Sequence, residues 1–249
     1  MKPRIVRWVM AVLFWSQPAI FSEGPPEFRP ALVGNGPDSL VNLIDTPKLL
    51  KQGQGDGVVM FSQVVLKGPV NGNFGSVYRG TPNSKALQKE VLRALSKARF
   101  IPAIAHGKPV PVYFQGTVLF FAKATPHLRV LANQDPTALL RFDDFIAPQA
   151  ILGTLGWLRN DPRLQPAVRL NKNGGVTFEL HVSETGKLLS TKVVSEDPPG
   201  YNFAAVEKDM LSSAEFIPGF RNGKPVDCSF QMTRYVWIEH HFGYGSGGL

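Results

Sequence analysis

The side chains that could perform acid–base, nucleophilic or metal chemistry are scattered along this chain. Its histidines are His106, His127, His181, His240 and His241. The last two are adjacent, so a strand would point them to opposite sides of a sheet and they would make a poor chelate. The chain has one cysteine, which excludes the paired cysteines of common zinc sites. We therefore expect no metal site and no cofactor.

Known catalytic motifs are also missing. Asp143 and Asp144 are adjacent carboxylates, but neighbours in sequence rarely converge on one substrate, and a turn or helix start before Phe145 explains them better. The sequence has no G-x-S-x-G elbow. The glycines between Gly68 and Gly75 lack the phosphate-binding pattern and predict a hairpin loop. These observations predict no catalytic residue and a protein that is not an enzyme, with an unrecognised hydrolase as the alternative.

Composition and charge indicate a folded protein without a nucleic-acid partner. Hydrophobic residues make up 43% of the chain and charged residues 18%, so most of it is expected to fold. Setting aside Lys2, Arg4 and Arg7, the formal net charge of +8 becomes +5, and it is spread without a basic run. The lone Cys228 either pairs between chains or, as we favour, is buried in a strand as a small hydrophobic residue.

The N-terminus has the features of an export signal. Three basic residues precede an apolar run over residues 8–15, and the polar residues after that run lead to a cleavage point after Ser22. Spanning a bilayer takes ~20 apolar residues, about twice this run. We expect residues 1–22 to be a cleaved signal peptide and the protein to be periplasmic or otherwise exported. An uncleaved segment that contacts the membrane is the alternative.

A repeat dominates the rest of the chain. Segment 100–110 recurs as 216–226, an offset of 116 residues, and ten of the 22 positions from Phe100 to Phe121 are identical in the second copy. Upstream of each copy, apolar residues recur at the spacing of an amphipathic helix. These residues are Leu87, Val91, Ala94, Leu95 and Ala98 in the first copy and Phe203, Val206, Met210, Leu211 and Ala214 in the second. Each stripe ends before a proline that forbids further helix.

Strand patterns surround each helix. In the second copy, residues 176–182 alternate apolar and polar side chains, and a turn over 183–186 leads to a returning strand. The first copy has the same two strands around a glycine-rich turn. After each helix, a Gly-Lys-Pro-Val turn leads into a last strand, 112–121 or 228–237. Each copy is therefore predicted to be a β-β-α-β unit, one helix packed on a three-stranded antiparallel sheet, so the chain belongs to the α+β class.

Both copies resemble the C-terminal domain family of TonB. The shared pattern is an opening Gly-Val strand, a helix ending in Ala-x-Phe-x-Pro, a Gly-Lys-Pro-Val turn and a final strand. The first copy matches at Gly57-Val58, Ala98 to Pro102 and Gly107 to Val110, and the second at Gly175-Val176, Ala214 to Pro218 and Gly223 to Val226. The likeness covers roughly residues 57–122 and 175–238.

The resemblance implies a protein-binding module. Members of the family offer the edge of a sheet to an extended segment of an outer-membrane transporter, so that main-chain hydrogen bonds supply affinity. In this chain the edge would be the last strand of either copy. The implied binding residues are Phe230, Met232, Arg234 and Val236 in the second copy and Phe114, Thr117 and Leu119 in the first. The chain lacks the long proline-rich linker of an energy transducer, so coupling to a proton-driven motor is not implied.

These predictions divide the chain into six parts. They are a signal peptide (1–22), an extended lead (23–50), a first TonB C-terminal-like domain (51–124), a partly helical connector (125–166), a second such domain (167–239) and a flexible glycine-rich tail (240–249). The expected function is strand addition with an outer-membrane or envelope protein, linked to TonB-type transport. The alternative is a structural or envelope-assembly protein that self-associates through its sheet edges.

Overall fold

The computed structural model describes residues 27–68, 75–123, 125–141, 144–155, 161–236 and 238. The predicted signal peptide and the glycine-rich tail lie outside the described residues, as do Asp143, His240 and His241. The described chain is α+β, with mostly antiparallel sheets and few helices. Among its helices, none is long and apolar enough to cross a bilayer.

The first half of the chain forms most of a six-stranded sheet. Its centre has the order β3-β2-β6, and short strands extend it beyond β6. The strands are β2 (Gly57–Val65), β3 (Gly75–Gly80), β6 (Val112–Phe121), β7 (His127–Leu131), β8 (Gln149–Ile151) and β11 (Phe216–Ile217). Alternate residues of β2 and β6, such as Val59, Phe61 and Phe114, are buried in one core, as expected for strands with one face against helices.

The second half forms a three-stranded antiparallel sheet in the order β10-β9-β14. Its strands are β9 (Gly174–Val182), β10 (Leu188–Asp197) and β14 (Cys228–Val236). Val176, Phe178 and Leu180 of β9 point into a second core. The alternation predicted over residues 176–182 therefore assigns the buried face of this strand correctly.

One helix packs on the centre of each sheet. Helix α3 (Lys85–Leu95) contacts β2 and β3, and α6 (Phe203–Leu211) contacts β9 and β10. The predicted apolar stripes are buried, apart from Met210, which is half-buried. Shorter helices are α1 (Leu40–Leu43), α2 (Thr46–Lys51), α4 (Pro136–Arg141), the 3₁₀ turn η1 (Pro162–Leu164) and α5 (Gln165–Arg169).

The two Gly-Lys-Pro-Val segments form two tight hairpins. The first joins β4 (Ala103–Ala105) to β5 (Lys108–Val110), with β1 (Phe28–Arg29) beside β4; the second joins β12 (Gly219–Arg221) to β13 (Lys224–Val226). Both turn residues have positive φ in each hairpin, 49° and 72° at His106 and Gly107, 50° and 70° at Asn222 and Gly223. This is the geometry of a type I′ turn, for which Asn-Gly is the favoured pair.

The lead and the connector differ from their predicted forms. Residues 40–51 form α1 and α2 rather than an extended segment, and Asp45 caps α2 by accepting a hydrogen bond from the Lys48 amide at 2.9 Å. The connector contains strands as well as helices, because β7 and β8 both pair with β6. The unpaired main-chain groups of β6 are satisfied by these strands.

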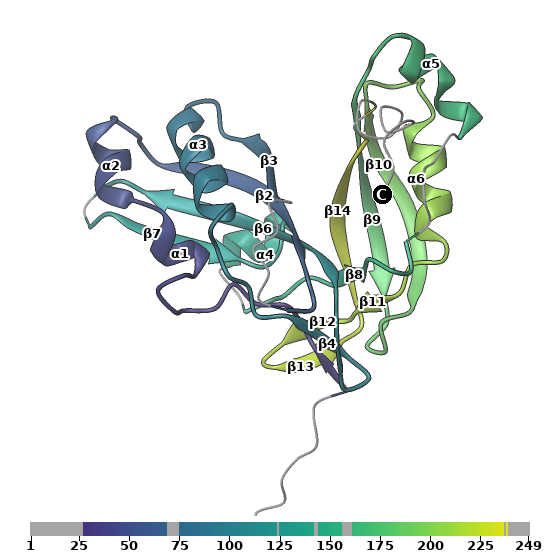
Figure 1. The fold of residues 1–249 in the computed structure, drawn as a ribbon, viewed down its shortest axis with the longest axis horizontal. Helices are drawn as coiled ribbons and strands as arrows, with labels where there is room; N and C mark the ends of the chain where they lie inside the picture. The colour runs from purple at the N-terminus through teal and green to yellow at the C-terminus, as the bar shows by residue number, and fades with distance from the viewer. Residues whose placement is uncertain are drawn as a thin grey trace, which may run out of the picture.

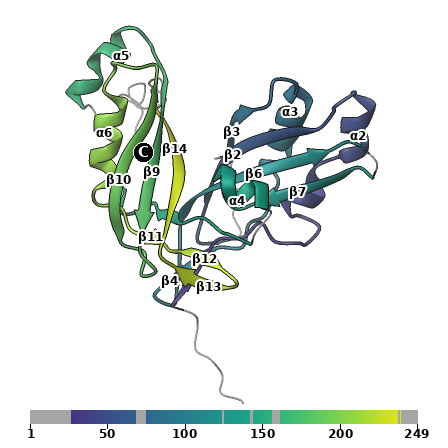
Figure 2. The same cartoon turned by 180° about the vertical axis from the view of Figure 1, so that it is seen from behind.

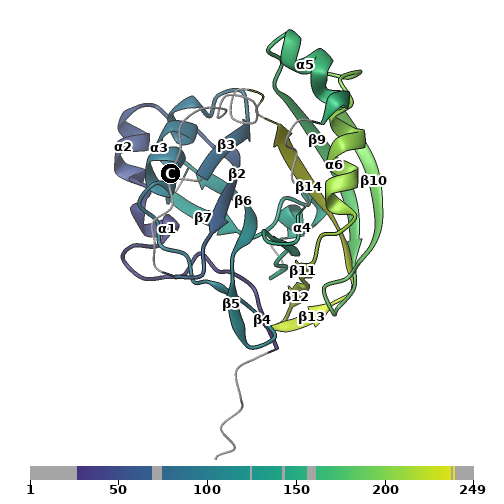
Figure 3. The ribbon, with the colours of Figure 1, turned by 45° about the vertical axis from the view of Figure 1, so that its right-hand side comes forward.

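The halves are joined at one end and diverge from it (Figure 1). The six-stranded sheet includes residues of both halves, since β11 of the second pairs with β8. Figure 2 shows the same junction from behind, with β12 and β13 below it. In Figure 3, β14 is the strand of the second sheet that lies nearest to the first sheet, and Figure 1 shows α6 on the side of the second sheet away from the first half.

Candidate functional site

Among the described residues, β14 is an edge strand. It pairs with β9 along its whole length and is last in the order β10-β9-β14. Gln115 of the first half reaches the main-chain oxygen of Thr233, so the main-chain groups of Thr233 point away from β9. Since directions alternate along an antiparallel strand, those of Ser229, Gln231 and Tyr235 point the same way. This side of β14 is a row of donors and acceptors to which β9 makes no bonds.

The side chains predicted to bind a partner on β14 lie elsewhere. Phe230, Met232 and Val236 are 4%, 2% and 1% exposed and belong to the core of the second half. They share the face of the sheet that α6 covers, because they belong to the same buried cluster as Phe203 and Leu211 of that helix. A partner at this edge would meet main-chain groups and the alternate residues, so the expectation that these three side chains contact it is corrected.

The equivalent strand in the first half is not an edge. Phe114 is buried in the first core, while Thr117 and Leu119 lie opposite Leu131 and Arg129 of β7. β2 pairs with β6 from the other side. The prediction that these residues offer a free edge is therefore wrong, because the connector supplies strands that fill it.

Arg234 makes buried contacts behind β14 and does not present its side chain to a partner at the edge. Its Nε donates to Glu207 Oε2 of α6 at 3.0 Å, and its guanidinium lies 5.2 Å from the centre of the Tyr113 ring of β6. The Glu207 side chain is fully buried and that of Arg234 is 15% exposed. A buried carboxylate needs such a cation, because desolvation otherwise penalises its charge. Arg234 therefore connects the helix of one half to a strand of the other.

A small polar and aromatic cluster joins the edge of β14 to the first sheet. The Gln115 carboxamide donates to Thr233 O at 2.8 Å and to the Tyr78 hydroxyl at 3.1 Å. The Tyr235 hydroxyl donates to Tyr78 O at 3.4 Å, and the two tyrosine rings lie 5.1 Å apart. Burial raises the pKa of Tyr78, Tyr113 and Tyr235. The phenols therefore stay neutral and act as hydrogen-bonding groups.

Sequence reasoning missed Gln115, Tyr78 and Tyr235. The identical pairs Phe114-Gln115 and Phe230-Gln231 were visible in the repeat, but an alignment does not show that one glutamine crosses to the other half. Tyr78 lies at an irregularity in the pairing of β2 and β3, which shifts the alternation and removes the signal.

The other described side chains considered for acid–base or nucleophilic chemistry contact neighbouring residues of the fold or are partly buried. His181 contacts Asp227, and Asp144 accepts a hydrogen bond from the main chain of Asn222. Cys228 is half-buried, not fully buried as favoured, and burial raises the pKa of its thiol to about 11. The thiol is therefore protonated near neutral pH. In the described ranges, no cluster of three or more His, Cys, Asp or Glu side chains could hold a metal.

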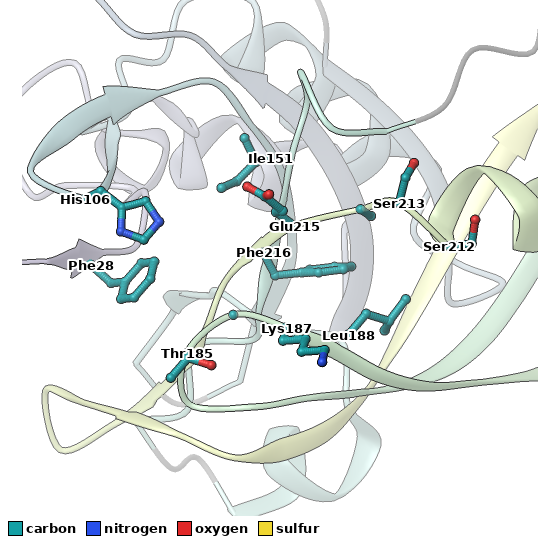
Figure 4. Close-up of a pocket in the computed structure, with 12 residues that line it drawn as sticks. Phe28, His106, Ile151, Thr185, Lys187, Leu188, Ser212, Ser213, Glu215 and Phe216 are labelled. Atoms are coloured by element: carbon teal, nitrogen blue, oxygen red, sulfur yellow. The ribbon is translucent and has the colours of Figure 1, made fainter.

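A cavity of about 360 Å³ lies at the junction of the halves. Figure 4 shows His106 and Phe28 of the first half on one side and Lys187, Leu188 and Phe216 of the second half on the other. The His106 and Phe28 rings pack edge to face at 5.1 Å. The lining mixes apolar rings with separated charges, which is typical of an interface between two packed units.

Comparison with known proteins gives no assignment of function for this chain. No family model, no curated protein and no solved structure matches it.

Proposed function

We propose that the chain is an exported protein-interaction module. It consists of two tandem β-β-α-β units, and the second binds an extended segment of an outer-membrane or envelope protein by strand addition to β14. The resemblance of both units to the TonB C-terminal domain family supports this proposal. So does the order β2-β3-α3-β4-β5-β6, which recurs as β9-β10-α6-β12-β13-β14 with β11 inserted.

One observation carries the proposal: in the described part of the chain, β14 is paired on one side, whereas β6 at the same place in the repeat is paired on both. Partners of β6 lie opposite Tyr113, Thr117 and Leu119. At the offset of 116 residues, these positions correspond to Ser229, Thr233 and Tyr235 of β14. The first half thus contains an internal example of strand addition, and a segment of another protein would take the same place on β14.

Site-specific photo-crosslinking in the source cell tests the proposal. The full chain would carry a photoreactive phenylalanine analogue at Ser229, which is exposed on β14, or at Lys192 on the opposite edge strand as a control. We expect an adduct with an envelope protein from position 229 and none from 192. Thr233→Pro removes a main-chain donor on the outward side of β14, so it should abolish the adduct while the sheet remains folded.

The self-association alternative is favoured by a different strand. β10 is the other edge of the second sheet, and Leu189, Val193 and Val194 are 50%, 41% and 47% exposed on it. Apolar side chains on an unpaired edge favour pairing between copies. Adducts that contain only a second copy of the chain would support this alternative and contradict strand addition by an envelope protein.

A further inference from the structure

We propose that the first half is an intramolecular occupant of the β14 edge, and that a partner strand binds only when the two halves separate. The partner in this statement rests on the proposed function. The intramolecular contact itself rests on Gln115, Tyr78 and Tyr235.

The Gln115 carboxamide uses the acceptor that an added strand would need. Its Nε2 donates to Thr233 O at 2.8 Å, a main-chain oxygen on the outward side of β14. An added strand would bring its own main-chain N–H to this oxygen. Gln115 therefore imitates one hydrogen bond of a partner strand, and the two cannot use the oxygen with the same geometry at once.

Tyr235 and Tyr78 cover the part of the β14 edge that follows Thr233. Tyr235 comes two residues after Thr233, so its main chain also points outward, and its hydroxyl donates to Tyr78 O of β3. The Tyr78 hydroxyl accepts from Gln115 as well. Three side chains from β3, β6 and β14 thus form one connected cluster across the gap between the sheets.

Spacing makes the two arrangements exclusive. Paired strands lie about 4.8 Å apart, and sheets packed face to face about 10 Å apart. The Gln115 side chain and its hydrogen bond occupy the space between β6 and β14 beside Thr233, so the main chain of an added strand enters only when this side chain is displaced. The halves are joined at the end that contains β8 and β11 (Figure 1), which leaves the other end free to open.

The test compares matched glutamines in the full chain. Gln115→Met keeps the side-chain length but removes the donor, and Gln231→Met makes the same change at the equivalent position of β14. Spin labels at Lys89→Cys on α3 and Lys208→Cys on α6, in a Cys228→Ser background, report the distance between the halves. Hydrogen exchange at Thr233 and Tyr235 reports exposure of the edge. The binding probe is a synthetic peptide of residues 126–132, the strand that pairs with β6.

We expect Gln115→Met to lengthen the label distance and to speed exchange at Thr233 and Tyr235 by about two- to tenfold, the effect of one hydrogen bond. Gln231→Met should change neither. Peptide affinity should rise by the same factor in Gln115→Met, because the closed state no longer competes.

Opening without any peptide binding would support the intramolecular contact and contradict the proposed function. An unchanged distance and unchanged exchange in Gln115→Met would overturn the inference, whatever the peptide does.

Discussion

Strands β6 and β14 occupy matching positions of the sequence repeat, yet in the described residues one lies inside a sheet and the other at an edge. Each pairs with the first strand of its own half. Within the residues that the structure describes, β6 receives further partners, from β7 and β8 of the connector, and β14 does not. The comparison shows that matching strands of a sequence repeat can differ in their pairing. In the first half, the segment that comes after β6 in the chain supplies the strands that fill its outer side.

The largest effect is expected at position 234, where β14 has a charge and β6 has an apolar residue. Val118, the equivalent of Arg234, is fully buried without any polar partner to satisfy. Arg234→Met would leave Glu207 without its cation in the core. We expect a loss of about 3–5 kcal/mol in the free energy of unfolding, measured by urea denaturation.

A double variant controls for this effect. Arg234→Met with Glu207→Leu removes both charges, as in the first half, where Val91 corresponds to Glu207. It should recover most of the lost stability. If the double variant is as unstable as the single one, lost packing rather than an uncompensated charge explains the result.

Proline substitution separates the paired strand from the edge strand. Thr117→Pro removes an outward main-chain donor on β6 in the part paired with β7, and we expect it to cost about 3 kcal/mol. Thr233→Pro makes the same change on the unpaired side of β14 and should cost less than about 1 kcal/mol. Thermal unfolding of both variants measures the difference. Equal losses would show that the outward side of β14 is as fully bonded as that of β6.

Acid should weaken the first half through Glu90. Burial opposes ionisation of this carboxyl, but hydrogen bonds from Arg93, the Asp45 amide and Lys48 outweigh it and lower its pKa from 4.5 to about 2. A lowered pKa stabilises the fold fully above pH 4.5, and this contribution is lost as the pH falls through about 2. We expect it to be about 1–3 kcal/mol, discounted because Arg93 and Lys48 are partly exposed.

Urea midpoints between about pH 6 and about pH 2.5 measure this contribution. Glu90→Gln should be less stable at neutral pH and should lose less stability on acidification than the wild type. Identical pH profiles for the two proteins would rule out Glu90 as the source.

The smallest effect concerns the paired turns. His106 and Asn222 both adopt positive φ, which asparagine tolerates better than histidine. His106→Asn should stabilise the protein by roughly 0.5 kcal/mol and Asn222→His should destabilise it by a similar amount. Thermal unfolding of the two variants checks the pair. The same sign for both would show that neighbours such as Phe28, rather than the turn, decide the preference.

Local patterns predicted much of the fold. The apolar stripes located both helices, and the alternation over 176–182 located β9 and its buried side. The identical Gly-Lys-Pro-Val segments located two hairpins whose turn residues share the same conformation. These features depend on neighbours in sequence, which is why spacing alone reveals them.

Pairing between distant segments was not predictable in this way. β8 has three residues and β11 has two, and their partners lie far along the chain. Such short strands carry too few residues for a period to be seen. Strand β14 was predicted, but the face that α6 covers was not, because alternation assigns Phe230 and Met232 to one face without saying which face is covered.

The burial of Glu90 and Glu207 could have been predicted from their positions on the apolar stripes of the two helices, although charged residues are usually expected at the surface. Glu90 comes three residues after Leu87 and four before Ala94, so it lies on the buried stripe of α3. Glu207 lies four residues from both Phe203 and Leu211 on α6. A carboxylate on an apolar stripe indicates a buried ion pair, and both residues have one.

The pairing of β11 with β8 has a consequence for how the chain acquires its structure during synthesis. Residues 216–217 complete a sheet whose central strands lie more than 90 residues earlier. The outer side of β8 therefore stays without its partner until the second half is available, although domains generally fold from the N-terminus as they appear. Closing this long-range contact is slow compared with forming the local hairpins. During this interval the edge of β8 is exposed to pairing with other chains, until β11 of the second half pairs with it.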